Sequence, residues 1–185
     1  MMTEISLNIL DIAQNSVSAH ATLIEITVQI AQSLNLLQVE IKDNGCGMTE
    51  EEAVKAQDPF YTTRTTRKVG LGIPFFKQAA LSCGGDFHME SEPGKGTKVY
   101  ASFQLTHIDR MPLGDMNSTL YSLITFHPSI DFVYTYRVDD KSFVLDTREM
   151  RSLLHNVPLN NPEVTVFLKN FLMENHEEAN EGIYF

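Results

Sequence analysis

Polar residues and glycines recur in this sequence at spacings that could do chemistry. In chain order, the motifs are Asp11-x-x-x-Asn15, Asp43-Asn-Gly-Cys-Gly-Met48, Gly70-Leu71-Gly72 and Gly94-Lys-Gly-Thr97. An ionised Asp and an Asn carbonyl oxygen are hard ligands that suit Mg²⁺ or orient a water molecule. A carboxylate before a glycine turn can accept a hydrogen bond from an exocyclic amine, and glycines admit a flat ring close to the backbone. Together the motifs predict a pocket for a magnesium-bound nucleotide.

Each motif has a plainer explanation when it is taken alone. Asp11 and Asn15 could belong to an ordinary solvated helix face, and Asp-Asn-Gly is a common turn. The nucleotide pocket is favoured because all the motifs occur in one chain, each at a different junction between predicted elements.

The first motif lies on a helix predicted over residues 4–19. Residues four apart share one face of an α-helix, and the sequence here divides into a polar and an apolar arc. Asp11 and Asn15 lie together on its polar arc. The other arc is apolar and requires a sheet beneath it. Its members are Ile5, Ile9, Ile12, Ala13 and Val17.

Alternation of apolar and polar residues predicts four half-buried, antiparallel strands arranged as two hairpins. These strands cover residues 24–30, 37–41, 86–90 and 98–105. Further helices are predicted at residues 49–57 and 73–82. The second strand leads directly to Asp43. The expected fold class is α/β, a two-layer sandwich of a mostly antiparallel sheet with helices on one face.

A phosphate site is expected where Gly70, Leu71 and Gly72 precede the helix at 73–82, because free N–H groups at a helix N-terminus bind anions. The preceding segment, about residues 57–69, is polar and basic and has no clear periodicity. It is a candidate mobile lid, from which Arg64, with Arg67 and Lys68, could face a triphosphate. A solvated loop without a specific role is the alternative for each of these cations.

Residues 5–105 resemble the ATPase domain of the GHKL superfamily, which includes gyrase, Hsp90, histidine kinases and MutL-type proteins. Five segments carry the resemblance. They are 11–22 for the N box, 43–48 for the first glycine box, 59–64 for the histidine kinase lid, 70–72 for the second glycine box and 90–97 for the last hairpin.

The resemblance implies ATP and Mg²⁺ as ligands and a role for each matching residue. Asn15 would coordinate Mg²⁺, Asp43 would bind the adenine amino group, and Thr97 would lie near the adenine. The remaining pocket residues would be Gly45, Gly47, Arg64, Gly70, Leu71 and Gly72. Asp11 would be catalytic, because it occupies the place of the general-base Glu of hydrolysing members. Asp is one methylene shorter than Glu, so its reach to an attacking water is the point at issue.

Composition is that of a soluble, cytoplasmic protein. The chain has 185 residues and a net charge of −10, which argues against nonspecific nucleic-acid binding. No run approaches the roughly 18 apolar residues of a membrane span, and no signal peptide is visible. The two cysteines lie in unrelated motifs, so no disulfide framework is expected.

The sequence is expected to divide into an ATP-binding domain, residues 1–105, and an α+β region, residues 106–185. The second region resembles no family, but its patterns predict several elements. They are a helix at 116–126, a hairpin over 132–145, a capping box at 146–149 that starts a helix, and a helix from 162. We expect this region to contact a protein partner.

The sequence is compatible with three functions. The protein could hydrolyse ATP as a switch, transfer the γ-phosphate to a partner protein, or sense nucleotide with negligible turnover. The motifs begin so near the start of the sequence that a phosphoacceptor is expected on another chain. The sequence does not indicate the partner, the acceptor residue or the oligomeric state.

Overall fold

A computed structural model describes residues 3–59, 71–155 and 157–185 of the chain. Its helices are α1 (Ile5–Ser18), α2 (Glu50–Ala56), α3 (Gly72–Ser82), α4 (Met116–Phe126), α5 (Thr147–Leu154) and α6 (Pro162–Asn180). Its strands are β1 (Leu23–Ala31), β2 (Leu36–Asp43), β3 (Phe87–Glu92), β4 (Gly96–Gln104), β5 (Asp131–Val138) and β6 (Lys141–Asp146). The predicted helices and strands all form, with small shifts of their ends.

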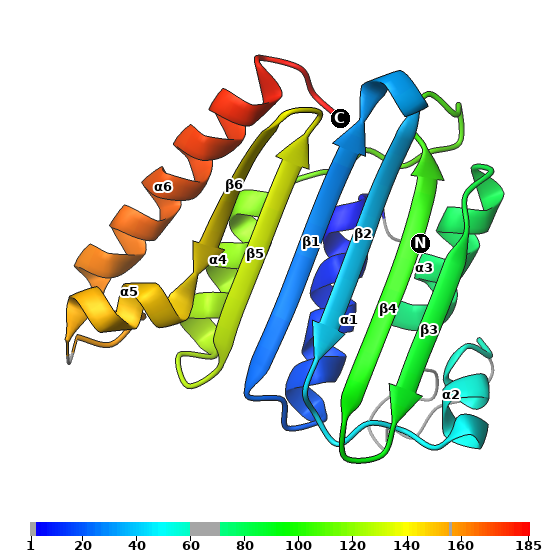
Figure 1. Cartoon of the computed structure of the whole chain (residues 1–185), viewed down its shortest axis with the longest axis horizontal. Helices are drawn as coiled ribbons and strands as arrows, with labels where there is room; N and C mark the ends of the chain where they lie inside the picture. The colour runs from blue at the N-terminus through cyan, green and yellow to red at the C-terminus, as the bar shows by residue number, and fades with distance from the viewer. Residues whose placement is uncertain (1–2, 60–70, 156) are drawn as a thin grey trace.

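The strands make one six-stranded sheet in the order β3-β4-β2-β1-β5-β6 (Figure 1). All neighbours are antiparallel except β1 and β5, which run parallel. The β1–β2 link contains a short 3-10 turn, Gln32–Leu34, and ends at Asn35 with a φ of 52°. The hairpins predicted before residue 105 and over 132–145 are therefore halves of the same sheet, joined through β1 and β5.

One face of the sheet is covered by helices, which confirms the predicted two-layer sandwich. In Figure 1, α1, α3 and α4 lie behind the strands, and α1 contacts both α3 and α4. Helix α6 packs on α4, β5 and β6. Every second residue of β1 is buried towards this layer, as the alternating pattern requires. Within the described residues, no helix is both long and apolar enough to cross a lipid bilayer.

The start of α1 is held by a segment that arrives from the C-terminal region. No side chain caps this helix end. Instead, the Pro112 carbonyl accepts from the Ile5 N–H at 3.0 Å, and the Leu113 carbonyl accepts from the Ser6 N–H at 2.8 Å. These bonds satisfy two of the N–H groups that a helix leaves open at its start. The helix that carries Asp11 and Asn15 is thus anchored by residues beyond the predicted ATP-binding domain.

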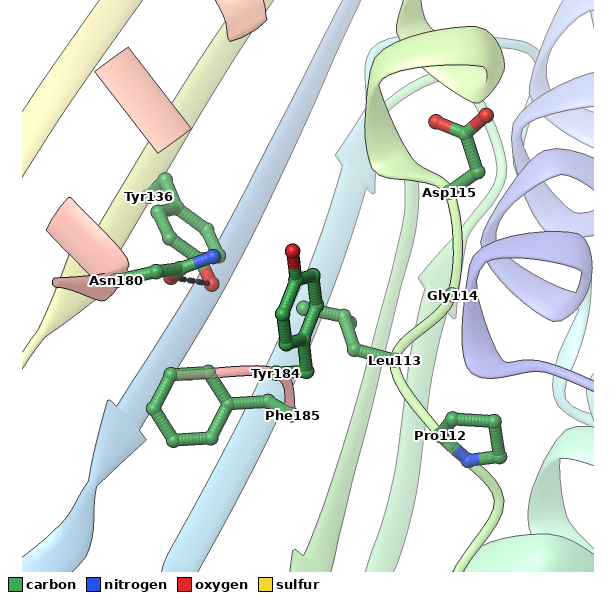
Figure 2. Close-up of a pocket in the computed structure, with 8 residues that line it drawn as sticks. All are labelled: Pro112, Leu113, Gly114, Asp115, Tyr136, Asn180, Tyr184 and Phe185. Carbon is green, nitrogen blue, oxygen red and sulfur yellow. Dashed lines mark hydrogen bonds between the residues drawn. The ribbon is translucent and has the colours of Figure 1, made fainter. Parts of the chain in front are cut away.

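The C-terminal tail joins the same anchor. The Leu113 N–H donates to the Phe185 carbonyl at 2.8 Å. Beside it lies an open hollow of about 360 Å³, which is shown in Figure 2 between the 112–115 segment, the chain end and the Tyr136–Asn180 hydrogen bond. None of the residues predicted to bind nucleotide lines this hollow.

Candidate functional site

Asp43, at the end of β2, is the centre of a small polar cluster under the first glycine turn. Its side chain is only 8% exposed. The Ser16 hydroxyl donates to Oδ2 at 2.6 Å, and the N–H groups of Gly45 and Thr97 donate to Oδ1 at 2.8 and 3.3 Å. Because an ionised carboxylate has about four lone-pair sites, it can still accept from a ligand amine. The cluster fixes the carboxylate in one orientation.

The glycine turn, residues 44–48, lies between the end of α1 and the β3–β4 hairpin and is hydrogen-bonded to both. The Cys46 N–H donates to the Ala19 carbonyl at 2.9 Å, and the Gly94 N–H donates to the Cys46 carbonyl at 2.8 Å. Gly47 has a φ of +65°, and a Cβ there would lie 2.0 Å from the Glu92 carbonyl oxygen. No other residue fits at position 47 without moving the hairpin, so the turn requires this glycine.

Thr97 lies beside Asp43 in the sheet ladder, as the pairing of β2 with β4 requires. Its hydroxyl is 2.8 Å from the Ser91 hydroxyl on β3. Ser91 in turn accepts from the Met48 N–H at 2.9 Å and donates to the Gly96 carbonyl at 3.1 Å. These contacts tie the glycine turn, Thr97 and the hairpin into one unit.

A second group of predicted residues meets at the start of α3. A Cβ on Gly72 would lie 2.5 Å from Asp11 Oδ2, so the Asp11 carboxylate rests directly against this glycine. Leu71 precedes the helix and provides no side-chain cap. The side chain at the N-cap position thus accepts no hydrogen bond from the first N–H groups of α3, and an anion could bind them. Asp11 and the second glycine box, far apart in sequence, are neighbours in the fold.

Asn15 lies on α1 between these two groups, one helical turn beyond Asp11 and next to Ser16. The described residues contain no group of three or more His, Cys, Asp or Glu side chains that could hold a metal ion by themselves. This donor set fits Mg²⁺ that arrives with a nucleotide, because protein-bound Mg²⁺ usually keeps several waters and takes its other oxygens from substrate phosphates. Asn15 would supply the protein ligand.

The structure thus brings the predicted residues together in two groups along α1, one beside its last turns and one beside its middle. In the first group are Asp43, Gly45, Gly47 and Thr97, and in the second are Asp11, Leu71 and Gly72. Arg64, Gly70 and nearly all of the predicted lid lie outside the described residues.

Three residues inside the predicted motifs were given no role from the sequence. Ser16 bonds Asp43, Ser91 bonds Thr97, and the Asn44 side chain accepts from the N–H groups of Thr22 and Leu23 at 2.9 Å each. The position of Ser16 could have been noticed, because it is a polar residue inside the apolar arc of the predicted helix, but its partner could not. Ser91 and Asn44 act through contacts distant in sequence, which no local pattern shows.

Comparison with known proteins gives a consistent result. A family model described as "Histidine kinase-, DNA gyrase B-, and HSP90-like ATPase" matches residues 1–107. The chain is 30% identical over 88 residues to Sporulation kinase C of Bacillus subtilis, a match covering 48% of this chain and 20% of that protein. It is 32% identical over 96 residues to the signal transduction histidine-protein kinase AtoS of Escherichia coli, covering 52% and 15%. The chain therefore matches a fifth or less of each of these relatives.

Among solved structures, the N-terminal domain of a DNA repair protein matches with a TM-score of 0.56 and 17% sequence identity. The match covers 78% of this chain and 53% of that chain. At this identity the likeness shows the fold alone. Because its share of the chain exceeds what residues 1–107 could supply, the similarity of fold continues into the C-terminal region.

Proposed function

Because the chain belongs to the family of histidine kinase-, DNA gyrase B- and HSP90-like ATPases, we propose that it binds ATP with Mg²⁺ and acts on the γ-phosphate. The action is hydrolysis as a conformational switch, or transfer of the phosphate to a partner protein. The observation that carries the proposal is the Asp43 cluster, a nearly buried carboxylate oriented by three donors beside a glycine turn.

The geometry supports a division of work along α1. Asp43 would accept the adenine amino group at one end. The N-terminus of α3 would receive phosphate at the other end, beside Asp11. Asn15, between them, would hold Mg²⁺, which neutralises charge on the phosphates when it is bound. The adenine and the phosphates would thus bind at two places along one helix, because Ser16 of α1 bonds Asp43 and Asp11 of α1 lies against Gly72.

We assign to Asp11 the role of taking a proton. Its carboxylate lies against Gly72, where the γ-phosphate would approach the helix N-terminus. In hydrolysis the proton would come from water, and in transfer it would come from the acceptor group of the partner. A general base must lie within hydrogen-bond reach of that proton, directly or through one water. Negligible turnover, the alternative proposal, would follow if the shorter Asp side chain does not reach it.

We also propose that the C-terminal region, residues 106–185, contacts a partner protein. We expect this chain to act in the cytoplasm. Support for a regulatory role comes from the carbonyl groups of Pro112 and Leu113, which hold the start of α1. A partner that moved this segment would act on the helix that carries Asp11 and Asn15. The nucleotide chemistry and the partner contact would then be coupled through α1.

Calorimetry with ATP and ADP, with and without Mg²⁺, tests the proposal. Asn15→Ala should weaken only the magnesium-dependent part of ATP binding, whereas Asp43→Ala should weaken ATP and ADP binding alike. γ-labelled ATP then separates the functions: free phosphate indicates hydrolysis, a labelled protein in cell extract indicates transfer, and neither indicates sensing. A wild-type protein without affinity for either nucleotide would contradict the proposal.

A further inference from the structure

Asn8, on the first turns of α1, has an unusual environment. Its side chain is fully buried. Its Nδ2 donates to the Glu4 carbonyl at 3.1 Å, but its Oδ1 has no hydrogen-bond partner among the described residues. No other buried side-chain nitrogen or oxygen in that part of the chain lacks a partner. A buried acceptor without a donor costs stability, so it requires an explanation.

The position of Asn8 on the helix relates it to the proposed site. Asn8 precedes Asp11 by three residues and Asn15 by seven, so the three side chains lie on one side of α1. That side faces α3, because Asp11 rests against Gly72. A different side of the helix faces α4, where the Thr119 hydroxyl donates to the Ser6 carbonyl at 3.5 Å. Asn8 therefore continues the polar stripe of the site by one turn.

We propose that the Asn8 Oδ1 accepts a hydrogen bond from the water molecule that attacks ATP, with Asp11 as the second acceptor. This inference rests on the proposed function. The water donates one hydrogen to Asn8 and the other to Asp11, which leaves a lone pair of its oxygen directed at the γ-phosphorus. A bond forms between that oxygen and phosphorus, and the bond from phosphorus to the β–γ bridging oxygen breaks. ADP leaves with the electron pair, and Asp11 receives the proton.

Two acceptors are needed because one hydrogen bond does not fix the orientation of water. The Asp11 carboxylate is one methylene shorter than a Glu, and a second acceptor compensates by holding the water in place. Asn8 suits this task because its Nδ2 already donates to the Glu4 carbonyl of the same helix, which leaves Oδ1 as the atom without a partner among the described residues. An acceptor side chain of a partner protein has only one N–H or O–H hydrogen, which Asp11 alone could bind. Asn8 would therefore favour hydrolysis over transfer.

The substitution Asn8→Leu separates this role from a structural one. It keeps the size of the side chain and removes the unpaired acceptor. We expect the nucleotide-free protein to melt a few degrees higher, affinity for a nonhydrolysable ATP analogue to stay within about twofold, and phosphate release to fall by about tenfold or more. Asn8→Ala, which adds no bulk, should lower phosphate release similarly.

Asn180→Leu is the matched control, because the Asn180 Oδ1 already accepts from the Tyr136 hydroxyl at 2.7 Å. It should lower the melting temperature and leave phosphate release unchanged. If Asn8→Leu instead lowers the melting temperature with normal release, Asn8 is structural and the inference is wrong. If the wild type binds Mg-ATP but releases no phosphate, the inference fails while ATP binding stands. Absence of binding would overturn both.

Discussion

Asp11 and Gly72 show how single residues of this site depend on each other. The carboxylate has room only because position 72 has no side chain: a Cβ there would lie 2.5 Å from Oδ2 and 3.2 Å from Cγ of Asp11. The first distance is shorter than real Cβ contacts are, and the second is tighter than most of them. The second glycine of the Gly-Leu-Gly motif would therefore serve the proposed base as well as the phosphate.

We predict that Asp11→Asn leaves nucleotide binding largely intact and reduces phosphate release by about 10²-fold or more, the usual scale for loss of a general base. The substitution keeps the shape of the side chain but removes its ability to accept a proton. Release of labelled phosphate under saturating Mg-ATP measures the effect. Glu25→Gln, which changes an exposed carboxylate paired with Lys42, is the control. Turnover that survives in Asp11→Asn would make Asp11 a bystander.

A second prediction at this scale concerns Gly72→Ala. Alanine is the better helix former by about 1 kcal/mol, so thermal stability should stay the same or rise. The new methyl group nevertheless forces the half-exposed Asp11 side chain to turn away, so phosphate release should fall by about tenfold or more. Melting curves and turnover are measured on the same preparation. A variant as active as the wild type would show that Asp11 need not lie against α3.

At the scale of elements, α6 is attached to the sheet by a buried histidine. The His176 Nδ1 lies 2.8 Å from the Leu172 carbonyl, which can only accept, so this nitrogen carries the hydrogen of the neutral ring. Nε2 is then the acceptor for the Tyr134 hydroxyl at 2.8 Å. Protonation of Nε2 would reverse this bond, because the ring would donate to the hydroxyl oxygen and the buried hydroxyl hydrogen would lose its acceptor. Burial lowers the pKa of His176 from 6.5 to about 4, although the nearby Asp115 opposes the shift.

This pKa shift predicts how stability depends on pH. The folded state disfavours the charged ring, so the contribution of His176 is complete above the unfolded pKa of 6.5 and is lost as the pH falls towards about 4. By pH 5, the free energy of unfolding should have fallen by about 2 kcal/mol from this residue. Denaturant titrations between pH 7 and 5 test it. His88→Gln, which removes an exposed histidine, should leave the slope unchanged, and a flat profile would contradict the buried neutral ring.

The sequence predicted elements better than it predicted their arrangement. The helix at 116–126 was predicted with the bounds that α4 has, and the alternating residues of β1 and β2 are buried as expected. These features depend on local periodicity. The pairing of β1 with β5 was not predicted, because alternation shows that a strand has a buried face but not which strand lies beside it. The contact of Ser16 with Asp43 was missed for the same reason.

At the scale of the whole molecule, the proposed boundary between residues 105 and 106 divides one sheet. Strand β5 pairs with β1 along eight residues, from Leu23 opposite Asp131 to Ile30 opposite Val138. The carbonyls of Pro112 and Leu113 also hold the start of α1. Within the described residues, however, the contacts of the proposed nucleotide site come from residues up to Thr97. Stability is thus shared across the boundary, whereas the site lies on one side of it.

A fragment of residues 1–105 should therefore bind ATP but be less stable than the full chain. Removing residues 106–185 leaves the edge of β1 unpaired, exposes apolar surface that α4 covers, and removes the carbonyls that cap α1. A fragment of residues 1–115 keeps those carbonyls, so it should melt higher than 1–105. The two fragments and the full chain are compared by calorimetry with ATP and by melting with and without Mg-ATP. A ligand that binds only the folded state raises its stability, so binding should raise the melting temperature. If a soluble, folded 1–115 fragment has no ATP affinity, the C-terminal region contributes to the pocket and the proposed division is wrong.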